Sequence, residues 1–130
     1  MLRKNCTLDF ENEGNNLAVL IKGEIDHYSA VWVRAEIDAK IAEVCPKNTV
    51  LCLSKIDFMD SSGIGLIMGR YARMQKLGGG LILRDPSERV ERICRLAGLE
   101  RIVTIEKSSE KSKEKSNEES KSENGGEENE

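Results

Sequence analysis

The sequence is short of the residues that metal binding, secretion and membrane insertion require. It has one histidine and four cysteines among 130 residues, and no two cysteines form a C-x-x-C pair, so a zinc site is not expected. The N-terminus lacks the apolar segment of a signal peptide, and no apolar run approaches the ~18 residues of a membrane span. We therefore expect a cytoplasmic protein with reduced cysteines, no metal or other cofactor, and no contact with a membrane.

The excess of negative charge is confined to the C-terminal segment. Residues 107–130 contain five lysines and eight acidic residues, and their balance of −3 equals the formal net charge of the whole chain. The remaining residues are neutral in sum, so a basic surface for nucleic acid is not expected. Because the segment has no aliphatic or aromatic residue, it cannot bury enough surface to offset the entropy of ordering. We predict one domain over residues 1–106 and a disordered tail over residues 107–130.

Apolar periodicity predicts an α/β domain with the element order β-β-α-β-α-β-α-β. Strands that alternate with helices are joined by right-handed crossovers, which give a largely parallel sheet with helices packed on it. The first two strands form a hairpin and add an antiparallel edge. The predicted strands span residues 6–10, 17–21, 49–53, 81–83 and 101–105, and the predicted helices run to about Val44, from Asp60 to about Lys76, and from a start at Asp85 to Gly98.

The rest of the chain is organised around the segment from Phe58 to Tyr71. A loop over residues 54–59 leads into it from a buried strand. Asp60, Ser61 and Ser62 are helix-start residues, because their side-chain oxygens accept hydrogen bonds from free backbone N–H groups. The glycines of the segment are interpreted as points where the helix packs closely against the sheet. Apolar spacing predicts one helix face formed by Ile64, Ile67, Met68 and Tyr71.

Three chemical roles for this segment each lack part of their sequence pattern. A serine hydrolase would pair Ser61 with His27, the only histidine, but the residues around Ser61 do not form the G-x-S-x-G elbow. A nucleotide-binding P-loop would need G-K-[ST], which is absent. A phospho-aspartate receiver would need paired acidic residues on the early strands to hold Mg²⁺, and only Asp26 lies in a comparable loop.

The remaining role is that of a phosphate acceptor at Ser61. A phosphate adds about −1.5 to −2 charges and three acceptor oxygens. The N-terminus of a helix favours anions, so the domain should tolerate the group without refolding. A partner that docks on this surface would then be repelled. The local chemistry therefore favours a switch residue, although an Asp-Ser-Ser sequence also caps helices without any other role.

The residues that carry this pattern also match a known family. The segment Phe58–Gly65, the sequence Gly69–Tyr71 and the upstream residues Gly23–His27 closely resemble the anti-sigma-factor antagonists, which are STAS-domain proteins. The resemblance runs from about residue 2 to residue 106 and is strongest to the sporulation type. It implies a STAS-type fold and a partner-switching protein that is not an enzyme and has no catalytic residues.

The resemblance further implies a cycle of binding and phosphorylation. The unphosphorylated chain would bind an anti-sigma factor that is also a serine/threonine kinase, and so release the sigma factor. The kinase would phosphorylate Ser61, and a PP2C-type serine phosphatase would restore the free hydroxyl. A stress-response antagonist of the stressosome type, with a different kinase, and a small serine hydrolase are the alternatives. The residues implied in partner binding are Asp26, His27, Asp60, Ser61, Ser62, Gly63, Gly65 and Arg70.

Overall fold

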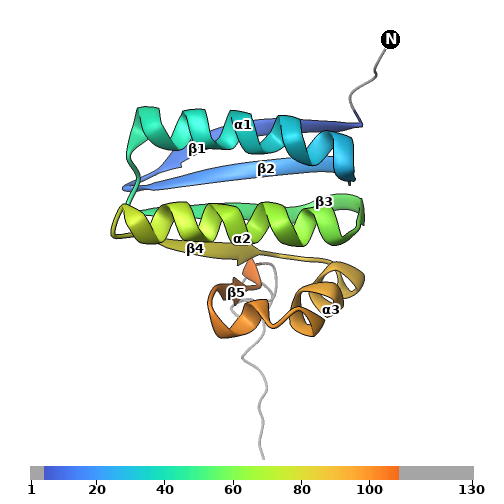
Figure 1. The fold of residues 1–130 in the computed structure, drawn as a ribbon. Helices are drawn as coiled ribbons and strands as arrows, with labels where there is room; N and C mark the ends of the chain where they lie inside the picture. The colour runs from blue at the N-terminus through green and yellow to red at the C-terminus, as the bar shows by residue number, and fades with distance from the viewer. Residues whose placement is uncertain (1–4, 109–130) are drawn as a thin grey trace, which may run out of the picture.

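The computed structural model describes residues 5–108, which build a mixed sheet with strand order β1-β2-β3-β4-β5 (Figure 1). Strand β1 pairs with β2 in antiparallel fashion, and every other neighbouring pair is parallel. The predicted element order and the antiparallel edge are confirmed. The elements are β1 Cys6–Glu13, β2 Asn16–Ile25, α1 His27–Val44, β3 Asn48–Met59, α2 Ser61–Lys76, β4 Gly80–Arg84, α3 Glu88–Leu96, the 3-10 helix η1 Leu99–Arg101 and β5 Thr104–Glu106.

The core lies between one face of the sheet and the helices. Side chains alternate along a strand, so Leu17, Val19 and Ile21 of β2 all point toward this face and are buried. Figure 1 shows α1 and α2 lying side by side across the sheet. Residues of α3 join the same apolar cluster. All three helices therefore share one core.

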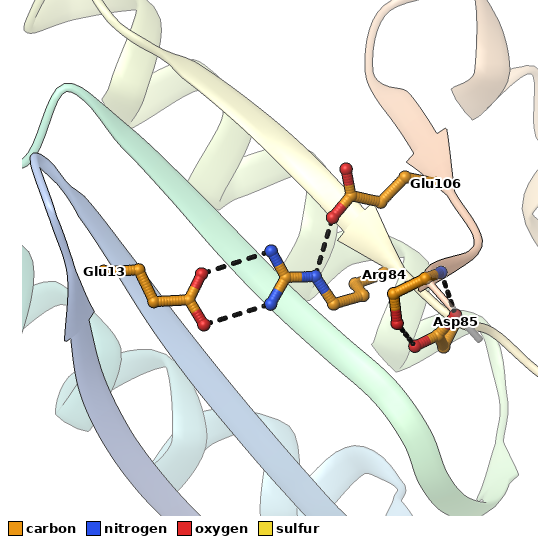
Figure 2. Close-up of polar contacts among 5 residues, drawn as sticks. Glu13, Arg84, Asp85 and Glu106 are labelled. Atoms are coloured by element: carbon orange, nitrogen blue, oxygen red, sulfur yellow. Dashed lines mark hydrogen bonds and ion pairs between the residues drawn. The ribbon is translucent and has the colours of Figure 1, made fainter. Parts of the chain in front are cut away.

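The opposite face of the sheet carries a charged cluster. Arg84 of β4 follows the buried Leu83 and so points to the other side. Its Nη atoms donate to Glu13 at 3.1 and 3.2 Å, and its Nε donates to Glu106 at 2.6 Å (Figure 2). The cluster ties the first hairpin and the last strand to the middle of the sheet.

Strand β3 is longer than predicted, because residues 54–59 continue the strand instead of forming a loop. They pair with the end of β2, where Ile25 lies opposite Met59. The register shifts twice along this pair, between Leu20 and Lys22 and between Gly23 and Glu24. Each irregularity breaks the alternation of apolar and polar residues, and this is why the pattern did not indicate a strand.

Two boundaries near the C-terminus also differ from the prediction. Helix α3 is capped by Ser87, which accepts a hydrogen bond from the Val90 N–H at 3.2 Å. The predicted cap, Asp85, has a φ of 55° and instead accepts from the backbone N–H and the hydroxyl of Ser108 at 2.8 and 2.6 Å. The last strand begins at Thr104 rather than at residue 101, because η1 occupies the preceding residues.

The predicted tail over residues 107–130 lies outside the described residues, apart from its first two. Lys107 contacts Glu91, with 2.6 Å between Nζ and the carboxylate oxygen, and Ser108 is held by Asp85. In the described part of the chain, no helix combines the length and the apolar character needed to cross a bilayer.

Candidate functional site

Helix α2 begins at the predicted place. Asp60 is the N-cap and accepts a hydrogen bond from the Ser62 N–H at 2.8 Å. Ser61 is the first residue of the helix and is exposed. Its hydroxyl has no hydrogen-bond partner among residues 5–108. The hydroxyl is therefore accessible, and it lies where free N–H groups and the helix dipole favour negative charge.

Helix α1 starts beside it with a reciprocal cap. Asp26 accepts hydrogen bonds from the N–H groups of Tyr28 and Ser29 at 3.1 and 2.9 Å, and the Asp26 N–H donates to the Ser29 hydroxyl at 2.9 Å. The Ser29 N–H is the main cause that lowers the pKa of the Asp26 carboxyl below 3.8. Asp26 therefore acts first as a structural cap.

Strand pairing brings the two helix starts together. Ile25 and Met59 are partners in the sheet, and the Asp60 N–H donates to the Ile25 carbonyl at 3.3 Å. The helix starts that follow these residues therefore lie at one edge of the sheet, at the same end of the molecule in Figure 1. This edge gathers most of the predicted site residues, namely Asp26, His27, Asp60, Ser61, Ser62, Gly63 and Gly65.

Close packing against the sheet explains only one of the three glycines of α2. A Cβ atom on Gly63 would lie 2.1 Å from Met59 Cγ and 2.5 Å from Met59 Sδ, so the helix can approach the sheet only because this residue is glycine. Apart from the adjacent backbone of the helix itself, a Cβ atom on Gly65 or Gly69 would meet no heavy atom of the described residues within 4 Å. The interpretation that all three mark close packing is therefore wrong for Gly65 and Gly69, and packing among residues 5–108 does not explain them.

The buried face of α2 is rotated from the predicted one. Of the predicted face, Ile67 is buried as expected, and Ile64 and Tyr71 are partly buried against the core, but Met68 is 48% exposed. The rotation brings a charged residue, Arg70, into the interior. The buried residues of the helix are Gly63, Leu66, Ile67, Arg70 and Met74.

Arg70 joins α2 to α1. The residue is 5% exposed, and its Nε lies 2.9 Å from Asp38 Oδ1. Burial is the main cause that lowers the pKa of Arg70, while Asp38 acts in the opposite direction. The structure therefore gives Arg70 a role in holding the two helices together, and its direct contact with a partner stays a prediction. The sequence contained no signal for Asp38, because a buried ion pair leaves no periodic pattern.

A hollow of about 300 Å³ lies between the first halves of α1 and α2. Val31, which is 52% exposed, brings apolar surface to it. Sequence reasoning found His27, Ser62 and Gly65 but missed the other residues that the first half of α1 contributes, since the hollow exists only once the helices are paired. The lining residues are His27, Ala30, Val31, Arg34, Ser62, Gly65 and Leu66.

The geometry does not assemble a serine hydrolase. His27 packs edge-on against Tyr28, with ring centroids 5.5 Å apart, and no hydrogen bond joins it to Ser61 in the described residues. A nucleophilic serine needs a base within hydrogen-bond reach. Within residues 5–108, no group of three or more His, Cys, Asp or Glu side chains is arranged to hold a metal ion.

Comparison with known proteins places these features in a family. The family model of the STAS domain matches residues 7–112. The chain is 35% identical over 101 residues to the anti-sigma F factor antagonist of Paenibacillus polymyxa, which covers 78% of this chain and 86% of the relative. It is 36% identical over 106 residues to the anti-sigma-B factor antagonist of Bacillus subtilis, covering 82% of this chain and 95% of that protein.

Two solved structures of one relative share the fold. The anti-sigma factor antagonist SpoIIAA in its unphosphorylated form superimposes with a TM-score of 0.67 at 27% identity, over 76% of this chain and 87% of the other. The Bacillus cell fate determinant SpoIIAA in the phosphorylated form gives a TM-score of 0.62 at 26% identity, over 76% and 90% of the two chains.

Proposed function

Because the chain belongs to the STAS-domain family of anti-sigma-factor antagonists, we propose that its unphosphorylated form binds an anti-sigma factor and thereby releases a sigma factor. This family is regulatory rather than enzymatic. The protein would act in the cytoplasm, where sigma factors work, and its domain would comprise residues 1–106. The binding surface would be the edge where α1 and α2 begin.

One observation supports this proposal most strongly, namely the exposed Ser61 hydroxyl on the first residue of α2. The anti-sigma factor would be a serine/threonine kinase. The Ser61 hydroxyl oxygen would attack the γ-phosphorus of ATP, the bond to ADP would break, and the hydroxyl proton would pass to a basic group of the kinase or to water. A PP2C-type phosphatase would then transfer the phosphoryl group to water. SpoIIAA, a relative with the same fold, has been solved in both phosphorylated and unphosphorylated forms.

The phosphate would act through charge and not through refolding. It would lie at the end of α2 that favours anions, so the helix start would remain in place. The surface around it would gain about −1.5 to −2 charges. Partner contacts by Asp26, His27, Asp60, Ser62, Gly63 and Gly65 would therefore be made only while Ser61 is unmodified.

The sporulation type is the form of this function that we propose. Residue His27 and the sequence Gly69–Tyr71 support it, whereas the overall identity to the F-type and B-type relatives is nearly equal, at 35% and 36%. Binding of the chain to a sporulation-type and to a stress-response anti-sigma factor, measured side by side, separates the types. Tighter binding to the stress-response factor would contradict the proposal.

Phosphorylation of the full chain by its anti-sigma factor tests the switch. With ATP, intact-mass spectrometry should find one added phosphate, which Ser61→Ala abolishes and the neighbouring Ser62→Ala retains. Ser61→Asp should weaken binding ten-fold or more, equivalent to about 1.4 kcal/mol, while the unfolding midpoint changes little. Labelling at another residue, or a large loss of stability in Ser61→Asp, would contradict the proposal.

A further inference from the structure

The space between α1 and α2 has a surplus of positive charge. Asp38 is the only carboxylate among the described groups that act on Arg70, and it serves two arginines through one oxygen. Its Oδ1 lies 2.9 Å from Arg70 Nε and 3.1 Å from Arg73 Nε. Arg34, one turn before Asp38 on α1, adds a third positive charge that also acts on Arg70. One negative charge therefore faces three positive ones.

This surplus is not fully satisfied within the described residues. Arg70 is 5% exposed, and its Nη1 atom is buried without a hydrogen-bond partner in the described part of the chain. A buried donor without a partner is unfavourable. The three positive charges around Asp38 therefore leave a net positive potential, which favours a negative group on the exposed side at Arg34.

Arg34 connects the charged space between α1 and α2 to the hollow, because it acts on Arg70 through its charge and also lines the hollow. Arg34 lines the hollow together with Ser62 and Gly65 of α2. Arg70 lies one turn beyond Leu66, which also lines it. The hollow is thus apolar along Val31 and Leu66 and carries a guanidinium group at Arg34. A guanidinium group binds a carboxylate through two parallel hydrogen bonds.

We infer that this hollow receives an aspartate or glutamate side chain of the anti-sigma factor, and that Arg34 is its ion-pair partner. The inference rests on the proposed function. Charge complementarity selects the occupant. If a phosphate on Ser61 expels the partner by charge, the partner must present negative charge beside the start of α2. A basic partner surface would instead be attracted to the phosphate.

The two acidic caps at the starts of α1 and α2 do not cancel this preference. Asp26 and Asp60 both accept hydrogen bonds from backbone N–H groups at the start of their own helix, so the positive helix ends offset their charge. Arg34 is the exposed cation that lines the hollow. Its positive charge attracts a negative group of the partner. A phosphate on Ser61, the residue before Ser62, would oppose that attraction.

Equilibrium binding of the full chain to its unphosphorylated anti-sigma factor tests the inference. Arg34→Glu should weaken binding ten-fold or more, and Arg34→Gln should weaken it less. Arg89→Gln, which removes an exposed arginine on α3, should leave the affinity unchanged. The dependence of the affinity on salt should also become shallower in Arg34→Gln. Unfolding midpoints close to that of the wild type will show that the variants fold.

The outcomes separate this inference from the proposed function. If the wild-type chain does not bind the anti-sigma factor, the proposed function fails. If it binds and Arg34→Glu binds equally well, the inference is overturned while the proposed function stands. Replacing the partner's acidic surface residues one at a time by lysine should restore the binding of Arg34→Glu at one position. A dimer of the wild-type chain that Arg34→Glu dissociates would make a second copy the occupant and would overturn the inference.

Discussion

Alanine at Gly63 and alanine at Gly65 should change stability in opposite directions, although the two residues are close neighbours on α2. At Gly63 the new methyl group would lie 2.1 Å from Met59 Cγ, which is about 1.4 Å short of an ordinary ~3.5 Å carbon–carbon contact. Met59 is 3% exposed and so has little room to move away. At Gly65 the methyl group would meet no neighbouring element of the described chain within 4 Å.

The magnitudes follow from two competing effects. Alanine in place of glycine favours a helix by up to about 1 kcal/mol, because it reduces the entropy of the unfolded chain. Overpacking a buried site costs about 1–3 kcal/mol, and the flexible methionine reduces that cost. We expect Gly63→Ala to destabilise the domain by about 1–2 kcal/mol and Gly65→Ala to stabilise it by about 0.5–1 kcal/mol.

Urea unfolding at neutral pH measures both changes as shifts of the midpoint at constant slope. Shifts of the same sign in the two variants would refute the account of why α2 contains these glycines. Partner binding adds an independent readout. Gly65→Ala should be more stable but should bind the anti-sigma factor more weakly, because its methyl group would extend into the hollow of the proposed partner surface. Unchanged binding would mean that Gly65 lies outside the interface.

Three other perturbations test separate parts of the structure. Because folding lowers the pKa of Asp26 below 3.8, its contribution to stability is present above that pH and is lost as the pH falls through the lower, folded value. Urea unfolding should therefore show an advantage over Asp26→Asn that is constant above about pH 5 and shrinks in acid; an advantage that grows in acid would contradict the cap. Burial raises the pKa of the Cys6 and Cys94 thiols to about 11, so a thiol reagent at pH 8 should label the exposed Cys45 first, and fast labelling of Cys6 would refute the packing of β1. Arg84→Met should cost about 1 kcal/mol and make the salt dependence of the unfolding midpoint shallower; an unchanged midpoint would mean that the charged cluster is only a surface contact.

The order of elements could be predicted because burial leaves a periodic trace in the sequence. Strand β2 is apolar over residues 17–21, as a central strand must be. The prediction of a loop over residues 54–59 was wrong, because the register shifts between β2 and β3 interrupt the alternation of apolar and polar residues. The predicted start of α3 was wrong because Asp85 and Ser87 are both good N-cap residues. Only the three-dimensional structure shows that Asp85 accepts a hydrogen bond from Ser108.

The position of the site could be predicted better than its surroundings. Asp60 and Ser61 indicate a helix start through their local chemistry alone, and in the structure they are the N-cap and the first residue of α2. The pairing of Arg70 with Asp38 could not be predicted, because the two residues lie on different helices and a charged residue normally indicates an exposed face. The hollow at Arg34 could not be predicted for the same reason. It depends on how two helices pack, and periodicity within one helix contains no information on that distance.

A switch that works by charge needs a helix start that does not move when the charge arrives. Two features of α2 supply that stability from different sides. Gly63 lets the first turn rest directly on Met59, and Arg70 fixes the next turns to α1 through Asp38. A phosphate on Ser61 would then leave the backbone in place and change only the potential at the edge of the sheet. Loosening either attachment should therefore reduce the difference in affinity between the phosphorylated and unphosphorylated chains.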